Sequence, residues 1–343
     1  MKIKRSVIAV LSLCLSLILA SYTDGFIRPG VLKFFNGIKG KGFKLTPQVE
    51  VRENGIPITI YPDLGPQINP VNIAQQALTY WDKGQYNLFL KIANWFCENT
   101  FEHDSFAVWQ YQFPWKSYNM TPPWVSGMAQ GLAVDVLGRA YHLTGNEIYL
   151  NTAKKALKAF LVPIEEGGVR TEDWWYEEYA DVGGKNPRVL NGMIYALQGI
   201  YNFWIITGDS LAKMIFDNGL SSLKKNLSMY DARGWSYYDA LHNIASEHYH
   251  RIHIKQMDWL YEITGDTLFA HYAVDWKGDL HSPLRFILVV LMKGPQESDI
   301  AVLIINFIGI YLLIVIINSI IKASREKNKG KESSHEFFQG KLL

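Results

Sequence analysis

The clearest pattern of hydrophobic and polar positions lies at the two ends of the chain. Three basic residues among the first five precede an apolar run over residues 7–20. This order is typical of a signal peptide or a signal anchor. Near the other end, the 22 residues 300–321 contain no charge and are dominated by Ile, Leu and Val. At about 1.5 Å per residue they span roughly 33 Å as a helix, which is enough for the core of a bilayer.

Charges beside the second run indicate an orientation. Five basic residues lie between Lys322 and Lys331, which predicts a cytoplasmic tail and places residues of about 25–298 on the extracytoplasmic or luminal side. The alternative for 300–321 is a buried core helix, and its length without a charge disfavours this. The predicted division is a signal peptide or signal anchor at 1–24, a β-rich element at 25–69, a helical catalytic domain at 70–282, a juxtamembrane segment at 283–299, a transmembrane helix at 300–321 and a basic tail at 322–343.

A repeat of about 60 residues organises the part of the chain between these ends. An apolar stretch with an aromatic residue four positions before a glycine recurs, and the glycines are Gly84, Gly145, Gly208 and Gly265. The last three are followed by Asn or Asp. Each copy predicts an apolar helix that ends at the glycine in a left-handed C-cap, and a second helix that begins directly after it.

Repeated helical hairpins predict a mainly α fold. Four copies cover about residues 70–280, and their different polar inserts favour closure into an α/α toroid around a central cleft. An open solenoid satisfies the same pattern. Ahead of the repeats, residues 48–52 and 56–60 alternate around Asn54-Gly55, a strong signal for a β-hairpin. We therefore predict an α/α toroid with a small N-terminal β-hairpin element and terminal membrane helices.

Composition narrows the functional classes. A chain of 343 residues that is 48% hydrophobic can bury a full core. Its formal net charge of +2 is too small to indicate a nucleic-acid partner. Cys14 lies in the apolar N-terminal run, so it and Cys97 do not make a disulfide framework. The 11 Trp and 19 Tyr suit a sugar-binding cleft, although a large core also absorbs aromatic side chains.

Two segments carry most of the candidate chemistry. Residues 174–179 read Trp-Trp-Tyr-Glu-Glu-Tyr, and residues 238–253 hold tyrosines beside carboxylates and histidines. A core has little use for so many polar groups, since each needs a partner. In a cleft, burial raises the pKa of a carboxyl such as Glu177 or Glu178 and makes it a usable acid or base. The alternative is an exposed acidic loop that caps a helix starting near Val189.

Three neighbouring histidines, His248, His250 and His253, invite comparison with a metal site. On a helix, His250 and His253 share a face while His248 points elsewhere. No cysteine or close acidic cluster completes a ligand set. We therefore predict partnered histidines in a core or cleft, and no metal.

Several motifs, taken together and in order, resemble one family. The segments are Trp124–Gly131, Trp175–Tyr179, Leu190–Tyr201, Tyr238-Asp239 with His242, and Tyr249-His250 with His253 and Gln256. Over about residues 45–275 they resemble the D-glucuronyl C5-epimerase of heparan sulfate and heparosan biosynthesis. The resemblance implies an α/α barrel with a β-rich N-terminal part, a homodimer, and a cofactor-independent exchange of the C5 proton that converts D-glucuronate to L-iduronate in a polysaccharide.

The resemblance also implies roles for individual residues. The catalytic groups fall on Glu178, Tyr238 and Tyr249. We expect Arg188 and Arg251 to bind the substrate carboxylate, because a guanidinium offers a bidentate fork; the alternative for each is a solvated surface arginine. The other side chains expected to bind substrate are Tyr179, Asn191, His242, His250, His253, Gln130 and Trp124.

Removal of a proton beside a carboxylate needs a base on one face of the sugar ring and an acid on the other. An ordinary tyrosine has a pKa of about 10, so holding it as a phenolate at pH 7 costs roughly 4 kcal/mol. Glu178 as the base, with a neutral tyrosine opposite, costs less. Either Tyr238 or Tyr249 is the partner.

Three other functions fit the same residues. A polysaccharide lyase uses the same proton abstraction and then expels the C4 substituent. A glycoside hydrolase with Glu178 as its acid needs a second carboxylate, for which Asp239 and Asp181 are the candidates. A glycan-binding membrane protein without activity is the third. The expected partners are an anionic uronate-containing polysaccharide and a membrane, with no nucleic acid and no cofactor.

Overall fold

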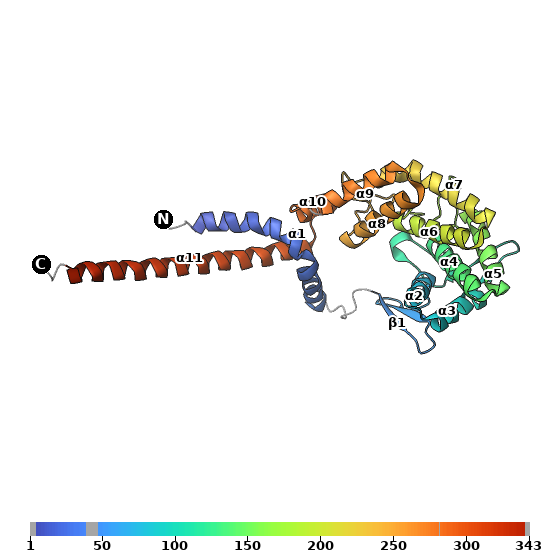
Figure 1. Cartoon of the computed structure of the whole chain (residues 1–343), viewed down its shortest axis with the longest axis horizontal. Helices are drawn as coiled ribbons and strands as arrows, with labels where there is room; N and C mark the ends of the chain where they lie inside the picture. The colour runs from blue at the N-terminus through green and yellow to red at the C-terminus, as the bar shows by residue number, and fades with distance from the viewer. Residues whose placement is uncertain (1–4, 39–46, 281, 340–343) are drawn as a thin grey trace. The chain divides into compact units, whose positions relative to one another are not determined.

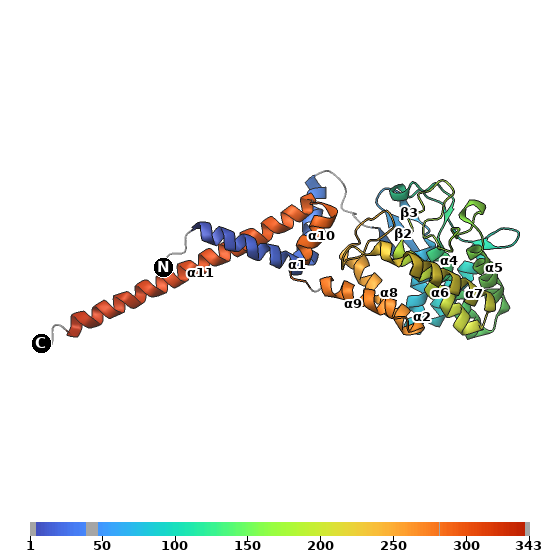
Figure 2. The same cartoon turned by 90° about the horizontal axis from the view of Figure 1, so that it is seen from above.

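The computed structural model describes residues 5–38, 47–280 and 282–339, and the side chains of these residues except 36–38 and 326–339. The chain is mainly helical, with three small sheets (Figures 1 and 2). It divides into two units. One is Lys44–Leu280, and the other combines Met1–Phe43 with His281–Leu343.

Four helical hairpins build the unit Lys44–Leu280, and they confirm the repeat seen in the sequence. The four repeat glycines all lie in the left-handed region, with φ between 67° and 69°. Asn146, Asp209 and Asp266 each accept a hydrogen bond from a backbone N–H at the start of the next helix. The hairpins are α2 (Pro70–Asp82) with α3 (Tyr86–Glu98), α4 (Gly127–Thr144) with α5 (Glu147–Leu157), α6 (Leu190–Thr207) with α7 (Ser210–Asn226), and α8 (Glu247–Thr264) with α9 (Thr267–Leu280).

The first helix of each hairpin forms an inner row. Helices α2, α4, α6 and α8 pack against one another in that order, and each also packs against its own hairpin partner. Figure 1 shows the hairpins following one another along an arc. This order of inner and outer helices is the one that the predicted toroid requires, and closure of the ring remains a prediction.

Glycines allow a very close contact between helices α4 and α6. A Cβ built on Gly199 would lie 2.0 Å from the carbonyl oxygen of Gly131, and one on Gly131 would lie 2.6 Å from Cα of Ala196. The two backbones therefore touch directly, which a larger residue at either glycine would prevent. This contact fixes the spacing of the two helices whose first turns meet the candidate site.

The sheets are short and lie before and between the helices. Strands β1 (Gln48–Val51), β2 (Pro57–Tyr61) and β3 (Gly65–Gln67) form an antiparallel sheet in the order β1-β2-β3. Gly55 has a φ of 87° in the turn between β1 and β2, which confirms the predicted hairpin. Two-stranded sheets join β4 (Phe101–Glu102) to β5 (Ala107–Val108), and β6 (Gln110–Tyr111) to β7 (Trp124–Val125).

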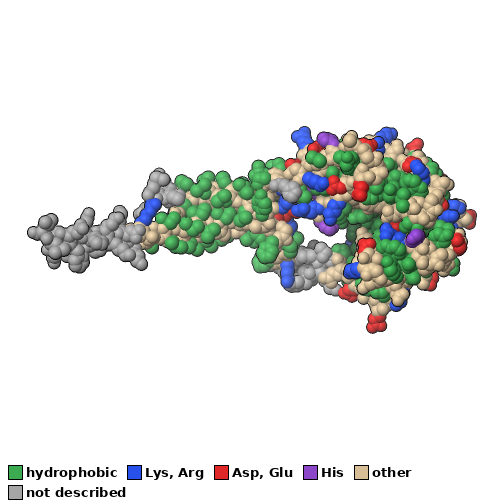
Figure 3. Space-filling view, viewed as in Figure 1, with side chains coloured by type: hydrophobic (Ala, Val, Ile, Leu, Met, Phe, Trp, Pro, Cys, Tyr) green, Lys and Arg blue, Asp and Glu red, His purple; other side chains and the backbone are tan. Residues whose placement is uncertain are grey.

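The second unit consists of α1 (Arg5–Ile38), α10 (Arg285–Lys293) and α11 (Glu297–Gln339). Helices α1 and α11 pack side by side, and both contain a stretch long and apolar enough to cross a membrane, Arg5–Phe35 and Glu297–Arg325. Figure 3 shows their apolar side chains as a nearly continuous green surface.

Paired residues show that α1 and α11 run antiparallel. Thr23 and Asn306 exchange side-chain hydrogen bonds of 2.9 and 3.1 Å, and Arg28 forms an ion pair of 2.6 Å with Asp299. Ser21 accepts the N–H of Phe286 at 3.0 Å, which also ties α10 to α1.

One sequence boundary needs correction. Helix α1 continues to Ile38, so the predicted β-rich element at 25–69 begins with helix, and its strands start only at Gln48. Residues 1–4, 39–46, 281 and 340–343, which fall in the predicted leader, β-rich element, helical domain and tail, lie outside the described residues, as do the side chains of Lys327, Lys329 and Lys331.

We predict that Gly199→Ala destabilises the full-length protein by about 3 kcal/mol, because its methyl group would overlap the backbone of α4. Thermal unfolding of the detergent-solubilised protein measures this. Gly278→Ala is the matched control, since a Cβ at this helical position meets no atom within 4 Å. It should be neutral or stabilise by up to about 1 kcal/mol. Equal melting temperatures for the two variants would contradict the close packing of α4 and α6.

Candidate active site

A pocket of about 260 Å³ lies where the four inner helices begin. Its wall includes Asn72 of α2, Met128 of α4, Asn191 of α6 and Tyr249 of α8, each within the first turn of its helix. The N-terminal end of a helix carries a partial positive charge and N–H groups without helical partners. Convergence of four such ends makes the pocket suitable for an anionic ligand.

The four helix ends differ in how their N–H groups are satisfied. Side chains of Asn69, Ser126 and Ser246 cap α2, α4 and α8, whereas the N-cap residue of α6, Val189, makes no side-chain hydrogen bond. Among the described residues, no hydrogen bond is seen for the backbone N–H of Asn191 or Gly192. The first turn of α6 therefore presents two adjacent N–H groups, those of Asn191 and Gly192, that could meet a ligand.

Glu178 lies directly against this first turn of α6. A Cβ built on Gly192 would be 2.1 Å from Oε2 of Glu178 and 2.6 Å from its Cβ. Only a glycine leaves room for the carboxylate at this place. A glycine inside a helix lowers the stability of that helix. At position 192 it is needed nonetheless, because a side chain there would occupy the place of the Glu178 carboxylate.

Backbone hydrogen bonds hold the loop that carries Glu178. Gly127, at the start of α4, donates its N–H to the carbonyl of Glu177 at 2.8 Å, and Val125 and Ala180 exchange N–H···O bonds of 3.0 and 3.2 Å. The carboxylate of Glu177 points away from the pocket, is fully buried and accepts the N–H of Arg188 at 2.9 and 3.0 Å. Glu177 thus ties the two ends of the loop together, and Glu178 alone of the pair reaches the cavity.

The surroundings of Glu178 change its acidity. Burial raises the pKa of its carboxyl from 4.5 to about 7, and interaction with Tyr179 lowers it only in part. Its Oε2 atom is enclosed and has no hydrogen-bond partner among the described residues. At neutral pH the carboxyl is therefore present in both protonation states and can accept or donate a proton.

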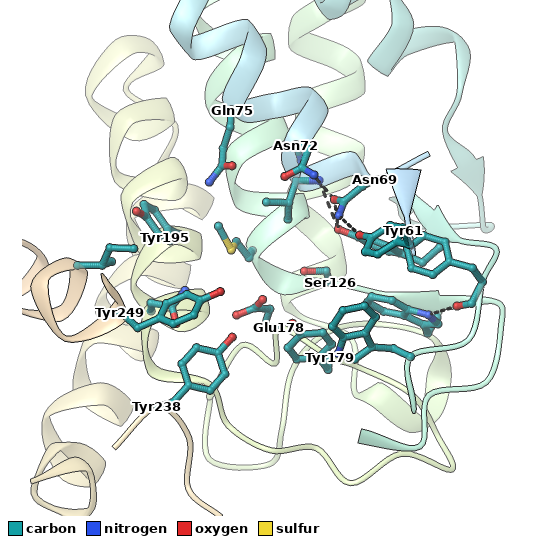
Figure 4. Close-up of a pocket in the computed structure, with 18 of the residues that line it drawn as sticks. Tyr61, Asn69, Asn72, Gln75, Ser126, Glu178, Tyr179, Tyr195, Tyr238 and Tyr249 are labelled. Carbon is teal, nitrogen blue, oxygen red and sulfur yellow. Dashed lines mark hydrogen bonds between the residues drawn. The ribbon is translucent and has the colours of Figure 1, made fainter. Parts of the chain in front are cut away.

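Two tyrosines face Glu178 across the cavity. The rings of Tyr238 and Tyr249 lie 4.6 Å apart at 56°, and their hydroxyls point toward the carboxylate in Figure 4. Burial and the nearby charge of Glu178 raise the pKa of both hydroxyls above the ordinary value. Both are thus neutral proton donors at physiological pH.

Aromatic rings form another part of the pocket wall. Tyr111 and Trp124 stack at 3.9 Å with their planes 11° apart, and the planes of Trp115 and Tyr179 are parallel within 8° at a centroid distance of 6.2 Å. The residues of the pocket that were not predicted to bind substrate or to take part in catalysis are Tyr61, Asn69, Val71, Asn72, Gln75, Tyr111, Phe113, Trp115, Ser126, Met128, Tyr195, His248 and Ile252. An available signal was Asn69-Pro70, a cap and first-turn pair that marks the start of a helix.

Six of the predicted site residues line the pocket. They are Glu178, Tyr238, Tyr249, Tyr179, Asn191 and Trp124. The other six, Gln130, His242, His250, His253, Arg188 and Arg251, do not, and their partners explain why.

The buried predicted residues serve the core. Gln130 accepts the N–H of Trp109 and donates to the carbonyls of Ala107 and Ala156. Both His250 and His253 make 2.8 Å hydrogen bonds to the hydroxyl of Ser236. Burial lowers the pKa of His250 to about 4 and that of His253 to about 3, so both are neutral.

The predicted arginines are paired elsewhere. Arg188 makes a bidentate ion pair with Asp173, at 2.7 and 3.0 Å, and Arg251 pairs with Glu247 on the surface of α8. His242 has a φ of 61° and lies against the ring of Tyr237. Among the described residues, no group of three or more His, Cys, Asp or Glu is arranged to hold a metal ion. No guanidinium group is therefore among the described residues that line the pocket.

Comparison with known proteins identifies the family. The family described as D-glucuronyl C5-epimerase C-terminus matches residues 103–278, just over half of the chain. The matched segment includes helices α4 to α8, Glu178 and both facing tyrosines. The chain belongs to the D-glucuronyl C5-epimerase C-terminal domain family, as the motifs in its sequence predicted.

Two curated relatives come from different organisms. An uncharacterized protein of Methanocaldococcus jannaschii is 40% identical over 180 residues, which cover 50% of this chain and 58% of the relative. The D-glucuronyl C5-epimerase of Caenorhabditis elegans is 31% identical over 227 residues, which cover 60% of this chain and 36% of the relative. The chain therefore matches only part of the length of both relatives.

Solved structures show weaker likeness. A sugar epimerase from a ruminal bacterium has a TM-score of 0.49 and 14% identity, covering 78% of this chain and 75% of the other. A GH76 α-mannanase of Bacteroides thetaiotaomicron has a TM-score of 0.47 and 12% identity, covering 91% and 86%. Likeness at this level says nothing about the reaction.

We predict that Glu178→Gln stabilises the protein at high pH. The folded-state pKa of the carboxyl, about 7, exceeds the ordinary 4.5, so wild-type stability is lost as the pH rises from 4.5 through 7. The variant has no carboxyl to ionise. Its stability should match wild type near pH 4.5 and exceed it by up to about 3 kcal/mol at pH 8.

Unfolding of the detergent-solubilised full-length protein at pH 4.5, 6 and 8 measures this difference. Glu166→Gln, at an exposed position in the same loop region, is the matched control and should show no such pH-dependent gain. A constant difference between Glu178→Gln and wild type over this range would contradict the raised pKa of Glu178.

Proposed function

We propose that this protein is an epimerase that inverts C5 of hexuronate residues in a polysaccharide, D-glucuronate to L-iduronate, without a cofactor. The observation that carries the proposal is Glu178, whose carboxyl has a pKa near 7 and faces the neutral hydroxyls of Tyr238 and Tyr249. Membership of the D-glucuronyl C5-epimerase family supports the same reaction class.

The uronate carboxylate binds at the open first turn of α6, where the N–H groups of Asn191 and Gly192 are available. Proton removal from C5 moves negative charge onto this carboxylate as an enolate, and N–H donors at a helix end stabilise charge that develops there. Placing the carboxylate at α6 brings C5 close to Glu178, which rests on the same turn.

The proposed reaction uses one base and one acid. Glu178 takes the C5 proton on one face, the enolate forms, and the hydroxyl of Tyr238 or Tyr249 donates a proton to C5 on the other face. Glu178 ends protonated and the tyrosine ends as a phenolate; proton exchange with solvent then restores both groups. In the reverse direction, the phenolate form would remove the proton and protonated Glu178 would return one.

The pocket favours this reaction over hydrolysis. Glycoside hydrolases use two carboxyl groups beside the scissile bond, and Glu178 is the one carboxylate among the described pocket residues. Asp239 is committed to Tyr118 and Asn243, and Asp181 to the N–H of Thr121. A lyase, which shares the first proton transfer, differs in its product and is distinguished by experiment.

We predict that the full-length protein, incubated with uronate polysaccharides in D₂O, incorporates deuterium at C5 without chain cleavage. Glu178→Gln and at least one of Tyr238→Phe and Tyr249→Phe should lower the rate roughly 100- to 10,000-fold. NMR of the polymer reports both the deuterium and the configuration at C5. Tyr261→Phe, on the exposed face of α8, is the matched control and should exchange at the wild-type rate.

The products separate the alternatives. Unsaturated ends that absorb in the ultraviolet would make the protein a lyase, and new reducing ends alone would make it a hydrolase. Binding without exchange on every polymer would support the glycan-binding protein instead.

We further propose that α1 and α11 anchor the protein in a membrane, with residues 47–280 on the extracytoplasmic or luminal side. Both helices contain apolar stretches of sufficient length, and the antiparallel pairing brings the ends that lead to residues 47–280 to the same side. The basic residues after 321 favour the cytoplasm for the tail. The homodimer implied by the family resemblance remains a prediction.

If α1 is a retained half of this anchor, Thr23→Cys and Asn306→Cys should form a disulfide in isolated membranes, since the two side chains are hydrogen-bonded. After proteolysis between the helices, the α1 peptide should stay linked to the α11 fragment until reduced. Thr23→Cys alone, which keeps Cys14 and Cys97, is the control. Loss of residues 5–20 from the membrane-bound protein would show that α1 is a cleaved signal instead.

A further inference from the structure

The loop that carries Tyr238 closes on itself through one buried carboxylate. Asp239, which follows Tyr238 directly, is fully buried. Its Oδ1 accepts the backbone N–H groups of Leu241 and Asn243 at 3.0 and 3.1 Å, and its Oδ2 accepts the side-chain amide of Asn243 at 2.7 Å. The carbonyl of Asn243 in turn accepts the N–H of Tyr238 at 2.6 Å. Residues 238–243 therefore form one hydrogen-bonded turn.

A further hydrogen bond ties this turn to a distant segment. The hydroxyl of Tyr118 donates to Oδ2 of Asp239 at 2.7 Å, and Tyr118 belongs to the short 3₁₀ helix Lys116–Tyr118. Of the four hydrogen bonds that the carboxylate accepts among the described residues, this one comes from outside the turn. Burial, and next the bond to Asp239, raise the pKa of the Tyr118 hydroxyl well above its ordinary value, so it remains a donor at physiological pH.

Tyr118 also contacts the side of the pocket that holds the candidate base. Its ring lies 4.8 Å from the ring of Tyr179, which follows Glu178 directly. Tyr179 and Tyr238 pack against the same apolar cluster, to which Tyr118 belongs. Tyr118 is not among the described residues that line the pocket. It therefore touches the neighbour of the candidate base, and Asp239 beside a candidate acid, without reaching the cavity itself.

The backbone of Tyr238 is held on its other side by α6. Its carbonyl accepts the N–H of Leu190, the first residue of α6, at 3.0 Å. Glu178 rests on the same turn of α6, against Gly192. The ring of Tyr238 also lies 4.6 Å from that of Tyr249, so a displacement of the turn would disturb both hydroxyls that face the carboxylate (Figure 4).

We propose that Tyr118 and Asp239 are positioning residues for the two tyrosines that face Glu178. They hold the acid side of the pocket in place, so that C5 is reprotonated on the face opposite the base. A buried carboxylate that loses a donor is left partly unsatisfied, and the turn that it holds is then free to shift. This inference rests on the proposed function, because the reaction defines the place that the hydroxyls must occupy.

The face on which C5 is reprotonated reports this role. After exchange of its proton with solvent D₂O, Glu178 can return a deuteron to the face from which it took the proton, which leaves deuterated D-glucuronate. A tyrosine that donates from the opposite face gives deuterated L-iduronate. The ratio of the two products depends on the place of the tyrosine hydroxyls, and not on the amount of active protein.

The test uses the full-length protein in D₂O with two polymers, in which glucuronate alternates with N-acetylglucosamine or with N-sulfoglucosamine. Tyr118→Phe keeps the ring beside Tyr179 and removes the hydroxyl alone. We expect it to lower the initial ratio of deuterated L-iduronate to deuterated D-glucuronate, and kcat for inversion, by about tenfold, with KM within about twofold of wild type. Asp239→Asn, which changes the acceptor itself, should lower the ratio at least as much. NMR of the polymer counts both products.

Tyr149→Phe is the matched control. The hydroxyl of Tyr149 donates to Asn94 at 2.6 Å, and its exposed fraction of 6% is close to the 7% of Tyr118. Tyr149 belongs to α5 and does not line the pocket. The control should keep the wild-type ratio whatever its effect on the melting temperature. A wild-type ratio in Tyr118→Phe, or an equal fall in both variants, would overturn the positioning role.

Failure of the positioning role and failure of the proposed function give different results. Deuterium entry and inversion by the wild type, with an unchanged ratio in Tyr118→Phe, would leave the epimerase in place and remove the positioning role. Absence of deuterium entry on both polymers would overturn the proposed function, and the positioning role with it.

Discussion

The contact between the Glu178 carboxylate and the uncapped first turn of α6 is the interaction on which the rest of the site depends. Without a side chain at Gly192 the carboxylate fits against the helix, and without a capping side chain the neighbouring N–H groups remain open. Burial raises the pKa of the carboxyl to about 7, while the helix end supplies donors for a substrate anion. The candidate base and the candidate anion-binding site thus meet at one turn of helix.

The fold brings this turn into a usable place. Each inner helix begins at the pocket, because in every hairpin the first helix ends at a left-handed glycine and the second helix returns the chain to the same side. The backbone contact of Gly131 with Gly199 fixes α4 beside α6, and the N–H of Gly127 on α4 holds the loop that presents Glu178. Packing between two helices therefore determines the position of a catalytic candidate that belongs to neither.

Local signals made much of this predictable from the sequence. The helix ends at Gly145, Gly208 and Gly265, and the hairpin at Gly55, depend on backbone preferences within a few residues. The segment with Glu178 was predicted to line a cleft, because it holds more polar side chains than a core can easily provide with partners. Arg188 and His253 were misplaced because their partners, Asp173 and Ser236, lie 15 and 17 residues away and leave no local signal. No residue of α2 was named as a site residue for a similar reason, since only tertiary structure places Asn72 and Gln75 in the same pocket as Glu178.

Among the described residues that line the pocket there is no lysine or arginine, and this affects the acidity of Glu178. An arginine beside Glu178 would bind an anionic substrate more strongly, but it would also stabilise the ionised carboxylate and lower its pKa. The carboxyl would then be a weaker base at neutral pH. With helix ends in place of guanidinium groups, the pKa of Glu178 stays at about 7 while the N–H groups of α6 remain open to an anion.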